Sequence, residues 1–266
     1  MSFNNSIYSS KKIIKYSLEH GLEEIYDIVI KEEPINIFIN NEHYVTLLST
    51  PYMIKELVVG HLLSEGIINS FKEIDEIHIM KNNVMVHIPK EKNIKLELSK
   101  KIKLITSACG NLSDFFKLLD TLYKKPLSLN FKIHFEKILL AFKKLNENTI
   151  IYRRTGGTHA AALFNELAEL IYLAEDIGRH NAIDKVIGKA AIDNLNYENV
   201  FLATTGRQTI EMVLKAIRVG IPIVASISAP SEKSIKIADK YGLTLIGFVR
   251  GNRFNIYTHN ERIIFH

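Results

Sequence analysis

The sequence predicts an α/β protein in two parts, a smaller N-terminal α+β domain over residues 1–125 and a C-terminal domain over residues 126–266. From Ile150 onward, short apolar runs alternate with helical stretches. Strands that alternate with helices form βαβ units, so we expect a mixed, mainly parallel sheet there. In the first part, several strand-like runs accompany one clear helix, which is typical of an α+β arrangement.

In the first domain, the sequence predicts a hairpin followed by a helix. Residues 24–49 alternate apolar and polar positions, with Asn40-Asn41-Glu42 between the two runs. Thr50-Pro51 should open a helix that runs to about Glu65, because proline suits the first helical position. Further strands are expected at 76–80, 84–88 and 94–98, with another run at 103–107 and a helix at about 113–122.

In the second domain, strands and helices are expected to alternate. The strands are expected at 159–164, 169–175, 199–205, 221–228, 243–249 and 253–259, and the helices at 131–145, 181–193, 205–219 and 230–241. Thr205-Gly206-Arg207-Gln208 matches a capping box for the third helix, and Gly220 supplies its C-terminal stop.

Composition excludes several classes of protein. The 47% hydrophobic and 24% charged residues describe a soluble globular chain, and no apolar run approaches the roughly 20 residues of a membrane span. The N-terminus lacks the apolar segment of a signal peptide, so we expect a cytoplasmic protein without a membrane partner. The net charge of +5 suits an anionic partner, but the lysines are dispersed, which argues against nucleic acid. The single cysteine excludes an intrachain disulfide and zinc sites that need two thiolates.

Residues 174–190 concentrate charged and amide side chains just before a helix. Asp176, His180 and Asp184 are spaced four apart and would share a face if the helix began early enough. The stretch is either a strand-to-helix turn with a polar cap or a functional loop. Its polar members are Glu175, Asp176, Arg179, His180, Asn181 and Asp184.

Cys109 lies between a strand-like run and an expected helix, among the small residues Ser107, Ala108 and Gly110. A thiol near a helix N-terminus has a lowered pKa, because unpaired N–H groups stabilise the thiolate. A lone cysteine is also commonly a small buried apolar residue. The residues alone leave both interpretations open.

A second candidate site is the turn Phe248–Arg253, at the carboxyl end of an expected strand, where open α/β sheets bind ligands. Gly251 lets a ligand approach the backbone, and Arg250 and Arg253 can hold phosphate in a bidentate manner. The alternative is a tight turn with two solvated arginines. The turn consists of Phe248, Val249, Arg250, Gly251, Asn252 and Arg253, and the loops Thr204–Arg207 and Arg153–Gly157 are candidates to complete its pocket.

Several long stretches resemble the formate dehydrogenase accessory sulfurtransferase family (FdhD). They are residues 56–68, 107–111, 155–164, 174–190, 204–231 and 243–259, so the resemblance covers nearly the whole chain after about residue 25. The resemblance implies a three-layer, cytidine-deaminase-like C-terminal domain and a homodimer. It also implies that Cys109 receives sulfur from a cysteine desulfurase as a persulfide. Cys109 then passes this sulfur to the molybdenum cofactor, in its bis(molybdopterin guanine dinucleotide) form, before insertion into formate dehydrogenase. Phe248–Arg253 would bind that cofactor.

The chain departs from the family at Leu112. The family carries a Cys-x-x-Cys pair in this loop, and Leu112 stands where the second cysteine belongs. A second thiolate can attack the persulfide, close a disulfide and release the sulfur, and leucine cannot. A non-catalytic chaperone that only binds the cofactor is therefore the first alternative function.

His159 belongs to a Thr-His-Ala-Ala run that is similar to the His-x-Glu signature of zinc deaminases. Ala161 stands where the catalytic glutamate would be, and no Pro-Cys-x-x-Cys follows. A deaminase-like hydrolase is therefore disfavoured, and no metal site is expected. His159 is either packed in the interior or faces a cofactor.

Overall fold

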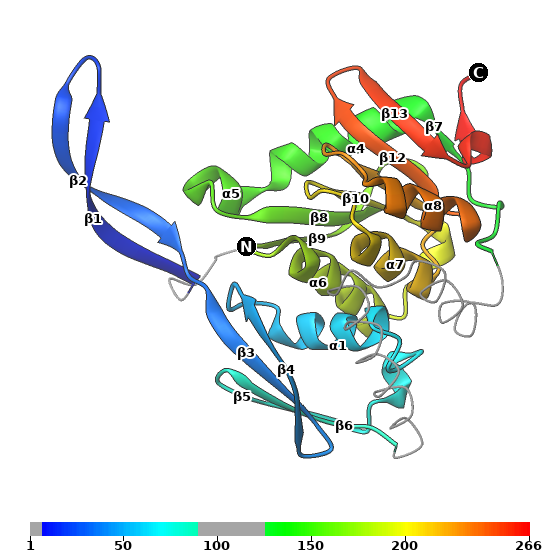
Figure 1. Ribbon diagram of the computed structural model, residues 1–266, viewed down its shortest axis with the longest axis horizontal. Helices are drawn as coiled ribbons and strands as arrows, with labels where there is room; N and C mark the ends of the chain where they lie inside the picture. The colour runs from blue at the N-terminus through cyan, green and yellow to red at the C-terminus, as the bar shows by residue number, and fades with distance from the viewer. Residues whose placement is uncertain (1–6, 90–125) are drawn as a thin grey trace.

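A six-stranded sheet with helices on both faces forms the body of the protein (Figure 1). The computed structural model describes residues 7–89 and 126–266. The segments expected at 94–98, 103–107 and 113–122 lie outside these residues, as do Cys109 and Leu112. Within the described ranges, no helix is both long and apolar enough to cross a membrane.

The central sheet has the strand order β13-β12-β11-β10-β8-β9. Its strands are β8 (His159–Phe164), β9 (Leu170–Asp176), β10 (Phe201–Thr204), β11 (Ile223–Ser226), β12 (Thr244–Arg250) and β13 (Arg253–Thr258). The pairs β10–β11 and β11–β12 are parallel, and the other three pairs are antiparallel. The sheet is mixed, as predicted, but parallel pairing is confined to its centre. The short turns within β8–β9 and β12–β13 explain this, because parallel neighbours need a long crossover.

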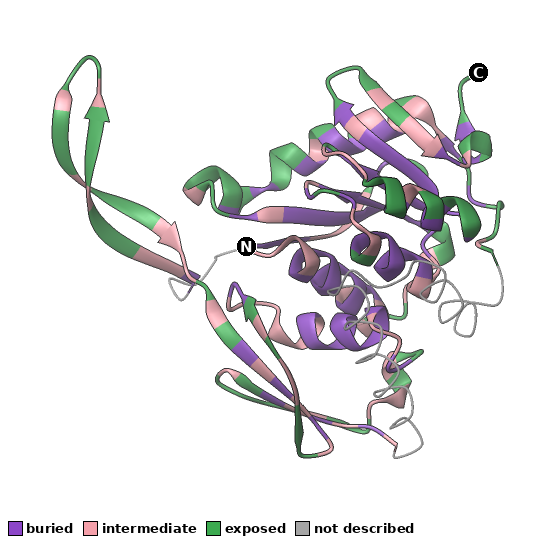
Figure 2. Cartoon of the chain, viewed as in Figure 1, coloured by how far each residue is buried: buried purple, intermediate pink, exposed green. Residues whose placement is uncertain are grey.

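Alternating residues of the strands build a separate apolar core on each face of the sheet. Along β8, Ala160, Ala162 and Phe164 face α4 (Phe135–Asn148). Ala161 and Leu163 face the opposite layer. That layer consists of α6 (Arg179–Ile192), α7 (Ile210–Val219) and α8 (Glu232–Lys240). Strands β8, β10, β11 and β12 are largely buried between these two helical layers, and Figure 2 shows the edge strand β13 more exposed. The result is three layers.

The N-terminal part adds a second sheet and one helix to this body. The four strands, in the order β4-β3-β6-β5, are β3 (Glu33–Ile39), β4 (Glu42–Ser49), β5 (Glu76–Met80) and β6 (Asn83–His87). The hairpin expected around Asn40 and Asn41 is present in β3–β4, and both asparagines have positive φ, as its turn requires. Helix α1 (Ile54–Ser64) lies between this sheet and α6.

The division at residues 125/126 stays a prediction, but the apolar core crosses it. Ile35 and Val84 of the N-terminal sheet, Leu57 of α1 and Ile183 of α6 belong to one cluster of buried side chains. The N-terminal sheet therefore depends on the C-terminal part to cover α1.

Several helix starts differ from the prediction. Helix α1 begins at Ile54, three residues after Pro51. Its N-cap is Met53, whose backbone is in the left-handed region with φ 52°. The prediction of a capping box at Thr205–Gln208 is wrong, because α7 begins at Ile210 with Thr209 as its N-cap. The Thr205 hydroxyl instead accepts a hydrogen bond from Ala160 N at 3.0 Å. The helix expected from Phe131 begins at Phe135, because β7 (Ile133–His134) first pairs with β14 (Ile263–Ile264).

A two-stranded ribbon extends from the body and was not predicted. It consists of β1 (Tyr8–Ser17) and β2 (Gly21–Ile30), paired antiparallel along their whole length (Figure 1). Its base packs near α5 (Ile150–Thr155), where the guanidinium of Arg154 lies 5.4 Å from the ring of Tyr8. The remaining short elements are the 3₁₀ turns η2 (Phe71–Glu73), η4 (Tyr197–Asn199) and η5 (Asn260–Arg262).

Candidate functional site

One edge of the central sheet brings most of the predicted site segments together. Strands β9, β10, β11 and β12 end at this edge, whereas β8 and β13 begin there. The register places His159 beside Asp176 and Ala161 beside Thr204. The antiparallel strands therefore bring their starting residues to the carboxyl ends of the parallel ones, where α/β sheets bind ligands.

The turn Phe248–Arg253 lies at this edge, between β12 and β13. Phe248 is half-buried at φ 55°, Val249 is buried, and Arg250 through Arg253 are exposed. Arg250 and Arg253 stand opposite each other in the ladder. Like charges in that position repel, so an anion between them would be favourable.

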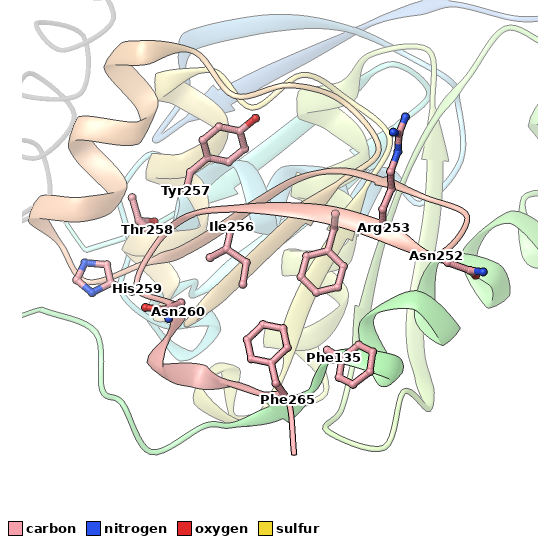
Figure 3. A pocket seen from close by; sticks show the side chains of 10 residues that line it. Phe135, Asn252, Arg253, Ile256, Tyr257, Thr258, His259, Asn260 and Phe265 are labelled. Carbon is pink, nitrogen blue, oxygen red and sulfur yellow. The ribbon is translucent and has the colours of Figure 1, made fainter.

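Both arginines of this turn have defined surroundings. Arg250 Nε donates a hydrogen bond to the Ile227 carbonyl at 3.1 Å, and its guanidinium lies 5.4 Å from the ring of Phe248. Arg253 and Asn252 lie at one end of a cavity of about 700 Å³ (Figure 3). Its floor includes the rings of Phe135 and Phe265, stacked with centroids 5.8 Å apart.

The arginines of the chain are concentrated at this edge. The sequence contains eight arginines, and six of them lie on segments that meet here: Arg153, Arg154, Arg179, Arg207, Arg250 and Arg253. Among the described residues, none of these six forms an ion pair with a carboxylate, whereas Arg218 pairs with Glu65. Guanidinium groups are suited to bidentate contact with phosphate, so the edge is suited to a phosphate-bearing ligand.

His159 is held in place at the start of β8. Its Nδ1 lies 3.2 Å from the hydroxyl of Thr205, which already accepts the Ala160 N–H. A hydroxyl that accepts one hydrogen bond can still donate its proton, so this contact suits an imidazole whose own proton is on Nε2. Burial, together with the positive charges of Arg179 and Arg207, lowers the pKa of His159. The imidazole is thus neutral at pH 7.

Glu175 and Asp176 have structural roles. The Glu175 carboxylate accepts hydrogen bonds from the N–H groups of Ile151 and Tyr152, at 2.9 and 2.7 Å, and so caps α5. Asp176 pairs with Lys185 at 2.6 Å, and both side chains are fully buried. The same carboxylate accepts the Ser49 hydroxyl at 2.6 Å, which ties β4 to the central sheet.

Asp184 also points into the interior. Its carboxylate binds Lys215 Nζ at 2.8 Å, the Ser64 hydroxyl at 2.6 Å and His61 Nδ1 at 3.1 Å. Asn181 bonds Asp176 at 3.0 Å. For Glu175, Asp176, Asn181 and Asp184, the structure supports the ordinary interpretation of a polar turn that stabilises the fold.

Arg179 and His180 differ from these neighbours. Helix α6 begins at Arg179, so Asp176 lies before it and does not share its face. Arg179 packs against Gly206, and its buried Nε has no hydrogen-bond partner among the described residues. Burial and the nearby Lys215 and Arg179 lower the pKa of His180 to about 4. Within the 174–190 stretch, these two residues remain candidates for contact with a ligand.

Comparison with known proteins gives consistent results. The family model described as the FdhD/NarQ family matches residues 30–264. "Sulfur carrier protein FdhD" of Saccharolobus solfataricus is 41% identical over 241 residues, which is 89% of this chain and 91% of that protein. The protein of the same name from Bacillus subtilis is 34% identical over 262 residues, covering 98% and 99%. The crystal structure of a formate dehydrogenase accessory protein from Desulfotalea psychrophila superposes with a TM-score of 0.78 at 27% identity, covering 97% of this chain and 100% of that one.

Proposed function

Because this chain belongs to the FdhD/NarQ family, we propose that it is a sulfur carrier that serves a formate dehydrogenase. In this role Cys109 takes sulfur from a cysteine desulfurase, and Phe248–Arg253 hold the molybdenum cofactor that receives it. The observation that supports the cofactor half of the proposal is the concentration at one edge of the sheet of six arginines that form no ion pair with a carboxylate of the described residues. Bis(molybdopterin guanine dinucleotide) carries two pyrophosphates, and arginine is the side chain that holds phosphate best.

The loading step transfers one sulfur atom between two cysteines. The Cys109 thiolate attacks the terminal sulfur of the desulfurase persulfide, which forms Cys109–S–S⁻ and releases the desulfurase cysteine as a thiolate. No external oxidant is needed, because the sulfur already has the oxidation state of a persulfide. The protein is then a sulfurtransferase acting in the cytoplasm.

Release of the persulfide sulfur as sulfide needs two electrons. A second cysteine could supply them by forming a disulfide with Cys109, but this chain has one cysteine. A thiolate that attacks the inner sulfur of the persulfide forms a disulfide with Cys109 and expels the terminal sulfur as hydrosulfide. Leu112 cannot supply that thiolate. We therefore propose that it comes from a separate thiol: a low-molecular-weight thiol, a client protein or the Cys109 of a second copy in a homodimer.

The proposal is tested by mass spectrometry of the intact protein after incubation with a cysteine desulfurase and cysteine. We expect an addition of about 32 Da, one sulfur atom, that is absent in Cys109→Ser and removed by a reductant. An unmodified wild type beside an active desulfurase contradicts the carrier role. If the wild type nevertheless binds the cofactor, that result favours the non-catalytic chaperone, for which Leu112 is the supporting observation.

A further inference from the structure

Strand β13 forms one edge of the central sheet, and in the described part of the chain it pairs with β12 and with no other strand (Figure 1). The strand at the opposite edge, β9, is closed near its end. There the Tyr52 hydroxyl accepts the Glu175 N–H at 2.6 Å and donates to the Glu175 carbonyl at 2.5 Å. β13 contains neither proline nor lysine, the residues that commonly protect an exposed edge. Its main chain is therefore a template for an added strand.

The cavity of about 700 Å³ beside Arg253 is a groove that follows this edge. Every residue from Asn252 to Asn260 except Asn255 lines it, so it runs along β13 and not across it. The six residues of β13 span about 20 Å, at about 3.3 Å per residue. A groove along a strand of this length suits an extended segment of chain.

The floor of the groove is largely aromatic. Phe254 and Ile256 of β13 pack on the apolar core beneath α4. Phe135, the first residue of α4, stacks on Phe265, which is 48% exposed (Figure 3). Alternate side chains of a strand point to the same face. Apolar side chains at every second position of an added strand would therefore contact these rings.

Arg253 gives the groove a positive end. Its side chain is exposed, and within residues 7–89 and 126–266 it forms no ion pair with a carboxylate. The described residues that line the groove include no aspartate or glutamate. An acidic side chain at one end of the added strand would thus pair with this guanidinium.

We propose that β13 binds an extended segment of a different protein by strand addition. The segment has apolar side chains at alternate positions, which lie on the aromatic floor, and an acidic side chain beside Arg253. Main-chain hydrogen bonds to β13 supply affinity, and the alternating side chains supply specificity. A second β13 is not the occupant, because that strand has no acidic residue to pair with Arg253. The inference goes beyond the proposed function and does not depend on sulfur transfer.

The test measures the fluorescence anisotropy of short labelled peptides mixed with the full chain. In these peptides Phe, Leu or Val alternates with Thr, and Asp stands at each end. We expect saturable binding of at least one peptide. A peptide of the same composition with its apolar residues contiguous should bind at least about tenfold more weakly. If no alternating peptide binds, the proposal is wrong.

Phe265→Asp should weaken the best peptide at least about tenfold, because it places a carboxylate on the aromatic floor. Leu140→Asp is the matched control, since Leu140 is exposed on α4 and does not line the groove. The control should stay within about twofold of wild type. Unfolding midpoints equal to wild type show that both variants are folded. Equal affinities of the two variants would contradict the proposal.

N-methylated peptides test the main-chain bonds. The N–H groups of successive residues in a strand point to opposite edges, so methylation of alternate residues blocks one edge and leaves the other. Of the two possible isomers, one should keep its affinity and the other should lose at least about tenfold. If both isomers bind equally, the contact is not strand addition and the proposal is wrong.

Arg253→Glu should weaken the Asp-ended peptide at least about fivefold and strengthen a Lys-ended one. A wild type that binds GDP, a guanine nucleotide like that of the cofactor, but no alternating peptide would overturn this inference and leave the proposed function standing. Peptide binding without GDP binding would support the inference and contradict the cofactor half of the function. If Phe265→Asp changes the oligomeric state in gel filtration, the edge pairs with a second copy and the proposal is wrong.

Discussion

Gly60 of α1 and Gly188 of α6 lie against each other where the two helices cross. A Cβ on Gly60 would overlap the backbone of Asp184 and Gly188, and one on Gly188 would overlap Glu56 and Gly60. The N-terminal and C-terminal parts of the chain thus meet at backbone contact. That approach is possible because neither residue has a side chain.

Gly60→Ala and Gly188→Ala should each destabilise the protein by about 1–3 kcal/mol, because the helices must separate to admit a methyl group. The measurement is the midpoint of urea unfolding at neutral pH. Lys143→Ala, on the exposed side of α4, should stay within about 0.5 kcal/mol of wild type. A stable Gly60→Ala protein would mean that the helices do not cross at this point.

Arg250→Ala and Arg253→Ala should each weaken binding of GDP. Loss of a charge-assisted contact costs about 1.5–3 kcal/mol, or about ten- to a hundredfold in affinity. The double variant should lose more than either single one, because the two side chains stand opposite each other. Lys236→Ala on α8 is the control for net charge. Unchanged affinity in the double variant would place the phosphates elsewhere.

Leu112→Cys should create a route of sulfur release that the wild type lacks. The new thiolate, three residues after Cys109, can attack the persulfide and expel sulfide, provided that the Cα atoms come within about 7 Å. Loaded Leu112→Cys protein should lose sulfide spontaneously, whereas loaded wild type should keep it until a thiol is added. The assay follows sulfide release with time, and mass spectrometry detects the disulfide. Equal rates in both proteins would show that position 112 does not control discharge.

Lys185→Met should destabilise the protein strongly, since it leaves the buried Asp176 carboxylate without its cation. Loss of one partner of a buried pair costs about 3–5 kcal/mol. The double variant Asp176→Asn, Lys185→Met removes both charges and should recover part of that loss. The check is a double-mutant cycle of unfolding free energies. Additive losses would mean that the two groups do not interact.

His180 should make stability fall as the pH decreases from about 6.5 to about 4. Its pKa in the folded protein is about 4, below the ordinary value of 6.5. Between these values the unfolded chain binds a proton that the folded chain does not, which favours unfolding. His180→Gln should therefore show a smaller decrease over this window in urea unfolding midpoints. An identical decrease in the variant would show that His180 titrates normally in the folded state.

Much of the C-terminal half was predictable because its apolar runs are short and bounded by glycine, proline or polar residues. The expected strands end at about Thr204 and Arg250, and parallel strands end at the same edge of a sheet. The structure has both residues at one edge, as the sequence predicts. The sequence did not predict that His159 would reach the same edge from the start of an antiparallel strand. Pairing direction depends on contacts between distant segments, which a periodic pattern does not contain.

Other features carried no usable signal. Lys185 and Lys215 neutralise the two buried aspartates, yet in a lysine-rich chain they resemble any surface lysine. The capping box at Thr205 failed because the Thr205 hydroxyl is bonded to a neighbouring strand. The ribbon of β1 and β2 was missed because both of its faces are largely solvent-exposed, so its sequence lacks a buried face with period two.

The bond between Ser49 and Asp176 has a consequence for biosynthesis. The two residues are 127 positions apart, and the face of α1 that packs on α6 is covered only after the second has been made. At about 5–20 residues per second, a ribosome takes on the order of 6–25 seconds to travel between them. Through that interval the face of α1 around Gly60, which meets Gly188 of α6 in the folded protein, has no partner helix. The N-terminal sheet and α1 therefore cannot reach their final packing co-translationally before α6 has been made.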